Sequence, residues 1–346
     1  MGERVNSLLG GGLVVQDPSA ARSRRSGGLT CGVVVAGADR PMNLLGMGMG
    51  MRNRLAWAGA VAAVLITLGT VGHNSHRGVG VSTAEPKIVV RDAAITKQDR
   101  SRVETYWTGT GIANVAHGDA IGDPVQPEWA EGGLIARTVG RLYSQGAGGG
   151  LGACTATVVG TNTVITAAHC VRTAGARKPS RSASWDQQLY FVPGYRDGKS
   201  PYGGFTVRRV RMAEEWQDEG LDVAMLEMNS GHDGRSISEV TGVQRILFMA
   251  ESGTRTHFFG YPYTNRLLHC EGGNSREYRG SALLRIPCVM GVGSSGGPYV
   301  VDLDAAEAGS VVAVNVSSDD TFSYGTALGP FARRLYAQSE HCSQDC

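Results

Sequence analysis

Short apolar runs rich in β-branched residues recur along the chain after Thr138. Turn-forming residues such as Pro193 and Gly194 separate them. Many short strands, with turn signals at fairly regular spacing, indicate an all-β sandwich or barrel. Only the segment 329–339 has the apolar spacing of a helix, and Pro330 stands at its start. The runs lie at 154–159, 163–166, 189–192, 205–210, 223–226, 257–260 and 311–316.

The composition limits where the folded part lies and which partners it has. Glycine accounts for 50 of the 346 residues and is crowded near the N-terminus and in 145–152, whereas aromatic residues fall mostly after Tyr106. The packed core is therefore expected in the C-terminal two thirds. A net charge of +2, without a clustered basic face, is too small for nucleic-acid binding. No nucleic-acid partner is expected.

The segment 51–84 has the layout of an export signal. A pair of arginines precedes an uncharged apolar run, as in the n-region and h-region of a signal peptide. Because this segment begins at Met51, translation is expected to start at or near that residue, with 1–50 as an upstream extension. The alternative is a signal anchor, since 55–72 lies at the lower edge of the ~17–25 residues that span a bilayer. The chain contacts a membrane only if this segment stays uncleaved.

The next segment, 85–138, is polar and has little sustained periodicity. It contains Pro86, Pro124 and Pro127. A solvated linker or a propeptide fits this composition best. If the segment is removed as a propeptide, the chain is made as a zymogen.

The cysteines also favour export. The chain has 7 of them, and Cys31 lies before the apolar run and would be lost with it. The even set that remains is typical of disulfides in an oxidising compartment, although the six allow 15 pairings and the count does not choose among them. No Cys-x-x-Cys or His-x-x-x-His pair is present, so no metal site is expected. The remaining cysteines are Cys154, Cys170, Cys270, Cys288, Cys342 and Cys346.

Three segments contain the residue types that nucleophilic serine catalysis needs. His169 follows a predicted strand, Asp222 begins one, and Ser295 lies in Gly-Ser-Ser-Gly-Gly-Pro. Such catalysis requires a hydroxyl, an imidazole to take its proton and a carboxylate to orient that imidazole. Singly, each residue has a structural interpretation: a core histidine, a strand-edge carboxylate or a turn serine. Together, in the order His, Asp, Ser, they favour catalysis. His257 and His269 have no motif around them and are expected to be structural.

The segments 166–170, 222–226 and 293–298 closely resemble the three catalytic motifs of the trypsin/chymotrypsin-like serine peptidases. The resemblance extends from about Val139 to Tyr336 and is closest to the secreted actinobacterial trypsin-like peptidases. It implies two antiparallel β-barrels of chymotrypsin type with a short C-terminal helix. The peptidase domain would cover 139–346, with barrels at about 139–236 and 239–336. By position, His169 is then the general base, Asp222 its orienting partner and Ser295 the nucleophile.

Residues around Ser295 suggest further roles. The backbone N–H groups of Gly293 and Ser295 fit an oxyanion hole, which needs two converging donors and no obstructing side chain. Ser294 stands where relatives activated in the trypsin manner have an aspartate, so a buried amine-to-carboxylate switch is not expected, and its hydroxyl would donate a local backbone hydrogen bond. Val289 stands at the pocket floor where tryptic relatives have an acid, which argues against an Arg or Lys preference.

The resemblance also implies disulfides. The family's bridge next to the histidine falls on Cys154 and Cys170, and Cys270 with Cys288 is the natural second pair. Cys342 and Cys346 would close a short terminal loop, with an intermolecular bond as the alternative. The expected function is a secreted, monomeric serine endopeptidase that acts on proteins or peptides without a metal or organic cofactor. A non-catalytic binding protein on the same scaffold and an esterase with the same triad are the alternatives.

Overall fold

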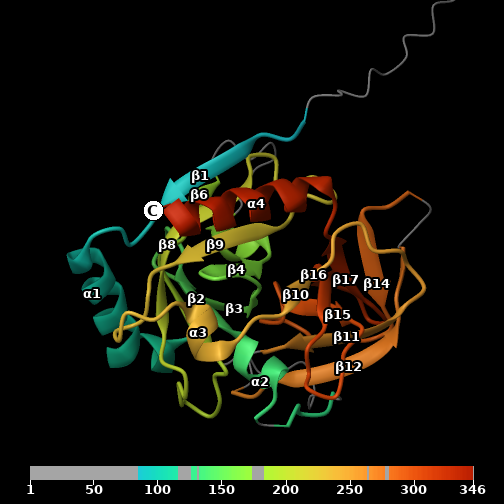
Figure 1. Ribbon diagram of the computed structural model, residues 1–346, viewed down its shortest axis with the longest axis horizontal. Coiled ribbons are helices and arrows are strands. Elements are labelled where there is room, and N and C mark those ends of the chain that lie inside the picture. Colours follow the sequence, from blue (N-terminus) through green and yellow to red (C-terminus); the bar gives the residue numbers. More distant parts are fainter. Residues whose placement is uncertain are drawn as a thin grey trace, which may run out of the picture. The chain divides into compact units, whose positions relative to one another are not determined.

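The computed structural model describes residues 85–115, 126–130, 132–173, 183–262, 265–276 and 280–345. The predicted upstream extension, the signal segment 51–84 and the pairing of Cys342 with Cys346 lie outside the residues that are described. Two β-barrels stand side by side in the described part (Figure 1). None of the helices in these ranges is both long enough and apolar enough to cross a bilayer.

Barrel 1 is a seven-stranded antiparallel sheet that closes on itself. The strand order is β1-β8-β7-β2-β3-β4-β9, and β8 also pairs with β9. Its inward side chains, such as Ile165 and Phe191, are fully buried. The strands are β1 (Ile88–Asp92), β2 (Val139–Gln145), β3 (Leu151–Val158), β4 (Thr163–Thr166), β7 (Gln187–Pro193), β8 (Phe205–Ala213) and β9 (Ala224–Met228), with the small pair β5 (Arg172–Thr173) and β6 (Ser184–Trp185) outside the sheet.

Barrel 2 is built mainly from antiparallel strands in the order β12-β11-β15-β16-β17-β14-β13, and β10 pairs with β16 in parallel. Phe258, Leu284 and Tyr299 are fully buried in its own core. The strands are β10 (Arg245–Ile246), β11 (Arg255–Gly260), β12 (Leu268–Gly273), β13 (Ser275–Arg276), β14 (Leu283–Ile286), β15 (Pro298–Val301), β16 (Ser310–Ser318) and β17 (Ser323–Ala327). The two-barrel fold of chymotrypsin type, predicted from the resemblance, is confirmed.

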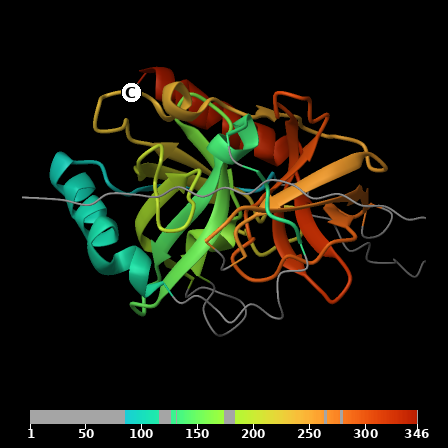
Figure 2. The same ribbon diagram turned by 90° about the horizontal axis from the view of Figure 1, so that it is seen from below.

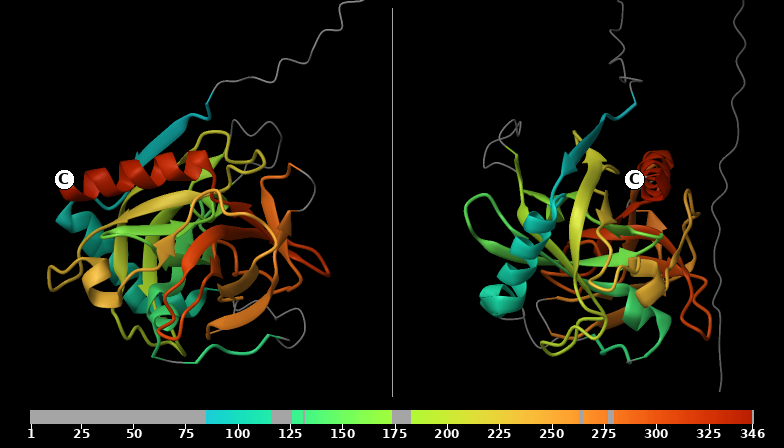
Figure 3. Two further views of the ribbon diagram at one scale, coloured as in Figure 1. Left: turned by 45° about the vertical axis from the view of Figure 1, so that its right-hand side comes forward. Right: turned by 60° about the vertical axis from the view of Figure 1, so that its left-hand side comes forward.

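The C-terminal helix α4 (Pro330–Asp345) leaves barrel 2 and lies along barrel 1 beside β9 (Figure 3). The hydroxyl of Tyr336 on this helix donates a hydrogen bond to the carbonyl of Val159 in barrel 1 at 3.1 Å. The helix begins where the sequence predicted but continues beyond residue 339. Five further helical segments have three to five residues: α2 (Leu134–Thr138), α3 (Ile237–Thr241), the π-helical turn η1 (Trp107–Gly111) and the 3₁₀ turns η2 (Ile112–Asn114) and η3 (Ala168–Cys170).

Residues 85–115 differ from the solvated linker that the composition suggested. Strand β1 pairs with β8 from Ile88 opposite Ala213 onward, along the part of β8 that β7 leaves free. Helix α1 (Lys97–Tyr106) follows, and a capping box between Thr96 and Asp99 satisfies its first N–H groups. It lies on the side of barrel 1 that is remote from barrel 2 (Figure 2). An edge strand and a capped helix anchor these residues to barrel 1. The interpretation of 85–138 as a linker or a propeptide stays a prediction.

Trp107 joins this N-terminal segment to barrel 1. Its side chain is 1% exposed, its ring lies 5.2 Å from that of Tyr143, and its indole N–H donates to the carbonyl of Gln188. We predict that Trp107→Ala lowers the free energy of unfolding by about 3–5 kcal/mol, the usual cost of emptying a large buried aromatic site. Denaturant unfolding would measure it. Val90→Ala, at a half-exposed position of β1, is the matched control and should change stability little. Equal effects would contradict the anchoring role.

Candidate active site

His169 and Asp222 are brought together by neighbouring strands of barrel 1. His169 lies in η3, just after β4, and Asp222 just precedes β9; β4 and β9 pair so that Thr166 lies opposite Ala224. His169 Nδ1 lies 2.8 Å from Asp222 Oδ2, and the His169 backbone N–H donates to Asp222 Oδ1 at 3.0 Å. Both carboxylate oxygens therefore hold the histidine, one through the ring and the other through the backbone.

Ser295 lies in the loop 291–297, here called the serine loop, which precedes β15. Three of its positions favour glycine, because Gly291, Gly293 and Gly296 have φ angles of +80°, +97° and +78°. A Cβ on Gly296 would lie 2.1 Å from Thr166 Oγ1, so the loop lies against the end of β4 that leads into His169. Within the described residues, the hydroxyl of Ser295 makes no hydrogen bond to His169, and such bonds commonly tighten only when substrate binds.

The serine loop presents two free backbone donors. Among the described residues, the N–H groups of Gly293 and Ser295 donate to no acceptor, whereas both of their carbonyls accept hydrogen bonds from Thr155. Gly293 is buried and Ser295 is half-buried. Buried N–H groups are rarely left unpaired in native structures, so this pair of donors is suited to an anionic oxygen.

Thr155 connects the two barrels at this point. From β3 of barrel 1, its N–H donates to Ser295 O at 2.8 Å and its hydroxyl donates to Gly293 O at 3.0 Å. The same hydroxyl accepts from Tyr261 N at 2.9 Å, just past β11 of barrel 2. Its carbonyl accepts from Thr166 Oγ1 at 2.9 Å. Sequence reasoning missed Thr155, because it is one of two threonines in the run 154–159 and nothing in the sequence distinguishes it from Thr157.

Ser294 is 2% exposed and takes part in a neutral hydrogen-bond network. Its hydroxyl donates to Gly291 O at 2.6 Å, which confirms the predicted local backbone bond. It also accepts from Asn315 Nδ2 at 3.3 Å, and Tyr299 OH donates to Asn315 Oδ1 at 3.2 Å. The carbonyl of Asn315 accepts from Gly296 N at 2.7 Å. Asn315 therefore holds the serine loop from β16, and sequence reasoning had not selected it.

A cavity of about 420 Å³ lies beside Asp222. Val289 is the predicted floor of the specificity pocket, but it does not line this cavity. It is half-buried, and its carbonyl accepts a hydrogen bond from Gln126 Nε2 at 3.4 Å. Both barrels contribute to the lining: Trp216, Gln217, Asp218, Glu219 and Gly220 come from barrel 1, and Leu283, Val316, Ser317 and Thr326 from barrel 2.

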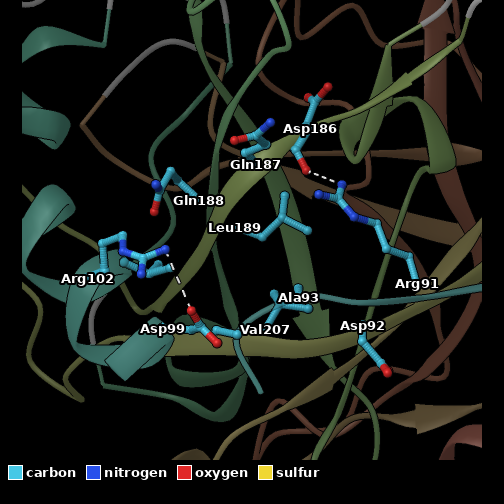
Figure 4. A pocket seen from close by; sticks show the side chains of 12 residues that line it. Arg91, Asp92, Ala93, Asp99, Arg102, Asp186, Gln187, Gln188, Leu189 and Val207 are labelled. Atoms are coloured by element: carbon cyan, nitrogen blue, oxygen red, sulfur yellow. Dashed lines mark hydrogen bonds and ion pairs between the residues drawn. The ribbon is translucent and has the colours of Figure 1, made fainter. Parts of the chain in front are cut away.

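A second cavity, of about 210 Å³, lies where β1 and α1 pack on β7 and β8 (Figure 4). Two of its arginines are paired: Arg91 donates to Asp186 O at 2.6 Å, and Arg102 lies 3.6 Å from Asp99. None of the predicted catalytic residues lines it. This cavity is therefore set apart from the His169–Asp222 contact.

Two barrels with a histidine–carboxylate contact in one and a glycine-rich serine loop in the other define the class of chymotrypsin-fold proteins. The sequence model of the trypsin family matches residues 137–327. The chain therefore belongs to the trypsin family, as the resemblance predicted. The predicted disulfides Cys154–Cys170 and Cys270–Cys288 are both present.

Solved structures with the same fold are serine proteases of low sequence identity. The thermostable serine protease AL20 from an extremophilic microorganism is 23% identical, with a TM-score of 0.54 over 60% of this chain and 99% of that one. The protease Anisep from Arthrobacter nicotinovorans is 26% identical, with a TM-score of 0.52 over 59% and 96%. A Glu endopeptidase in complex with MPD is 18% identical, with a TM-score of 0.51 over 64% and 99%. No curated protein matches the sequence.

Thr155 can be tested against a matched neighbour. We predict that Thr155→Val lowers the free energy of unfolding, because Gly293 O and Tyr261 N each lose a partner and an unpaired buried group costs about 1–3 kcal/mol. The same variant should have a lower kcat/KM. Thr157, also fully buried on β3, has a hydroxyl without a hydrogen-bond partner among the described residues. Thr157→Val should be neutral or stabilising. Denaturant unfolding of both variants measures their free energies of unfolding. Similar losses of stability in the two variants would contradict the role of Thr155.

Proposed function

We propose that this chain is a secreted serine endopeptidase in which Ser295 is the nucleophile, His169 the general base and Asp222 its orienting partner. The observation that carries the proposal is the double contact of Asp222 with His169, at 2.8 Å to the ring and 3.0 Å to the backbone. A carboxylate on Nδ1 favours the tautomer with a proton there, which leaves Nε2 free to accept the proton of a serine hydroxyl.

The proposed reaction is acyl transfer in two steps. Ser295 Oγ attacks the peptide carbonyl carbon while its proton passes to His169, and the oxyanion accepts hydrogen bonds from the N–H groups of Gly293 and Ser295. His169 then gives the proton to the leaving amine as the C–N bond breaks. Water attacks the acyl-enzyme, loses a proton to His169 and releases the acid, and Ser295 recovers its proton.

Secretion and peptide substrates are part of the same proposal. Disulfides such as Cys154–Cys170 persist in oxidising compartments, which supports an extracellular location. A binding protein with a closed cleft is less well supported, because a cavity of about 420 Å³ lies beside Asp222. An esterase with the same triad would turn over simple esters but not peptides, so a comparison of the two substrates separates these activities.

Covalent labelling tests the nucleophile. We predict that a fluorophosphonate probe labels the wild type and that Ser295→Ala abolishes labelling, because in the proposed mechanism Ser295 Oγ is the atom that attacks the probe. Ser294→Ala is the control on the adjacent residue. It should keep labelling within about 30-fold, since it removes two hydrogen bonds worth about 1 kcal/mol each. Labelling that survives in Ser295→Ala, or a folded wild type that never reacts, would overturn the proposal.

The proposed specificity is for an uncharged side chain at the cleavage position. Val289 offers no carboxylate to a guanidinium or ammonium group, and burying such a cation unpaired costs several kcal/mol. The strand β16 contains no histidine that would favour an acidic side chain. The polar groups of Asn315 are already paired with Ser294 and Tyr299.

A charge introduced at the predicted pocket floor tests its position. We predict that Val289→Asp raises kcat/KM for substrates with Arg at the cleavage position, relative to Leu, by at least about tenfold, because the buried cation gains a partner. Val289→Asn has nearly the same shape without the charge and should not produce this change. Chromogenic peptides that differ only in that residue measure it. If the two variants behave alike, Val289 does not form the floor.

A further inference from the structure

Two histidines and a glutamate gather on the β11–β12 hairpin of barrel 2 (Figure 1). The strands are antiparallel, with His257 opposite Glu271 and Phe259 opposite His269. Alternate residues of a strand point to opposite faces. Phe258 and Cys270 are buried in the core of barrel 2, so His257, His269 and Glu271 share the other face.

The ligand atoms of these side chains have the spacing that one small cation needs. His257 Nδ1 lies 3.0 Å from His269 Nε2 and 3.4 Å from a carboxylate oxygen of Glu271, and all of these atoms lie within 4.8 Å of one another. Zn²⁺ binds His and carboxylate ligands at about 2.0–2.2 Å in a tetrahedron, whose ligand-to-ligand edges are then ~3.3–3.5 Å. Small side-chain adjustments would accommodate an ion.

The surroundings keep both imidazoles available as ligands. The ring of His269 lies 4.7 Å from that of Trp129 and 4.9 Å from that of Phe259, and the side chain of His257 is 16% exposed. Burial lowers the pKa of His257 and lowers that of His269 to about 4. Glu271, 42% exposed, leaves a path for an ion and a water molecule.

We propose that His257, His269 and Glu271 form a site for one divalent transition-metal ion of the Zn²⁺ type, with water as the fourth ligand. The sequence predicted no metal site because spacing rules detect ligands that lie near one another along the chain, whereas these ligands face one another across two strands. The site lies outside the catalytic machinery. Its role would be to clamp the hairpin, since bound metal stabilises the folded state.

Arg255 provides a sharp test because it competes with the metal for Glu271. Its guanidinium lies 2.7 Å from both carboxylate oxygens, but its side chain is 71% exposed, so the pair contributes little to stability. A cation bound to Glu271 would displace Arg255 or be repelled by it. Arg255→Gln should therefore tighten metal binding, which a merely adventitious surface site has no reason to do.

The experiment is titration calorimetry with Zn²⁺ on the full chain carrying Ser295→Ala, which prevents self-cleavage, supported by the visible absorption of bound Co²⁺. His257→Gln and His269→Gln should each weaken binding by about 100-fold or more, and Glu271→Gln by about tenfold, as expected when ligands of a metal are lost. The melting temperature should rise with Zn²⁺ in the parent and not in the histidine variants.

Two controls separate this site from other histidines. His232→Gln removes a histidine whose side chain is 83% exposed, and His169→Gln removes the histidine held by Asp222. Neither should change the affinity. Loss of binding in His169→Gln alone, affinity unchanged by Glu271→Gln and Arg255→Gln, or no binding at micromolar Zn²⁺ would each overturn the proposal. Arg255 and Glu271 are exposed, so their substitution should not prevent folding. Their variants therefore still test the proposal if a histidine variant fails to fold.

Discussion

The hydrogen bonds of Thr155 are the interaction on which the arrangement of the site depends. The buried apolar cluster of barrel 1 continues into barrel 2 through residues such as Val300, Val311 and Val314, but apolar burial is not directional and does not by itself fix how the barrels are aligned. Thr155 joins β3 to the serine loop and to Tyr261 through buried partners. A buried donor or acceptor without a partner costs about 1–3 kcal/mol, so few other alignments of the barrels satisfy these groups. The same alignment sets Gly296 against Thr166, close to His169.

The serine loop is held by neutral groups rather than by charge. Ser294, Asn315 and Tyr299 form a buried chain of hydrogen bonds, and Asn315 also contacts the loop through its backbone. The amine-to-carboxylate pair of relatives activated in the trypsin manner needs a new amino terminus, which cleavage creates. Neutral partners are present in the uncut chain, so the loop is ordered without cleavage.

The sequence was informative wherever the signal is local. Strand runs and turn residues were enough for an all-β fold, and the short motifs around His169, Asp222 and Ser295 identified the candidate site. Thr155 and Asn315 could not be found in this way, because their partners lie on other strands and a buried hydroxyl or amide has no local pattern of its own. The strand and helix of the N-terminal segment were not predicted, because β1 depends on an edge of β8, although Thr96 and Asp99 did carry the signature of a helix start.

Strand β11 links the proposed metal site to the candidate active site. His257 lies near its middle, and the chain leaves the strand at Tyr261, whose N–H donates to Thr155. The neighbouring strand β12 carries His269 next to Cys270, whose disulfide leads to Cys288 and on to the serine loop. The hairpin is thus attached to that loop at both strands. A metal clamp on its outer face would therefore stabilise the supports of Ser295 without contacting the substrate.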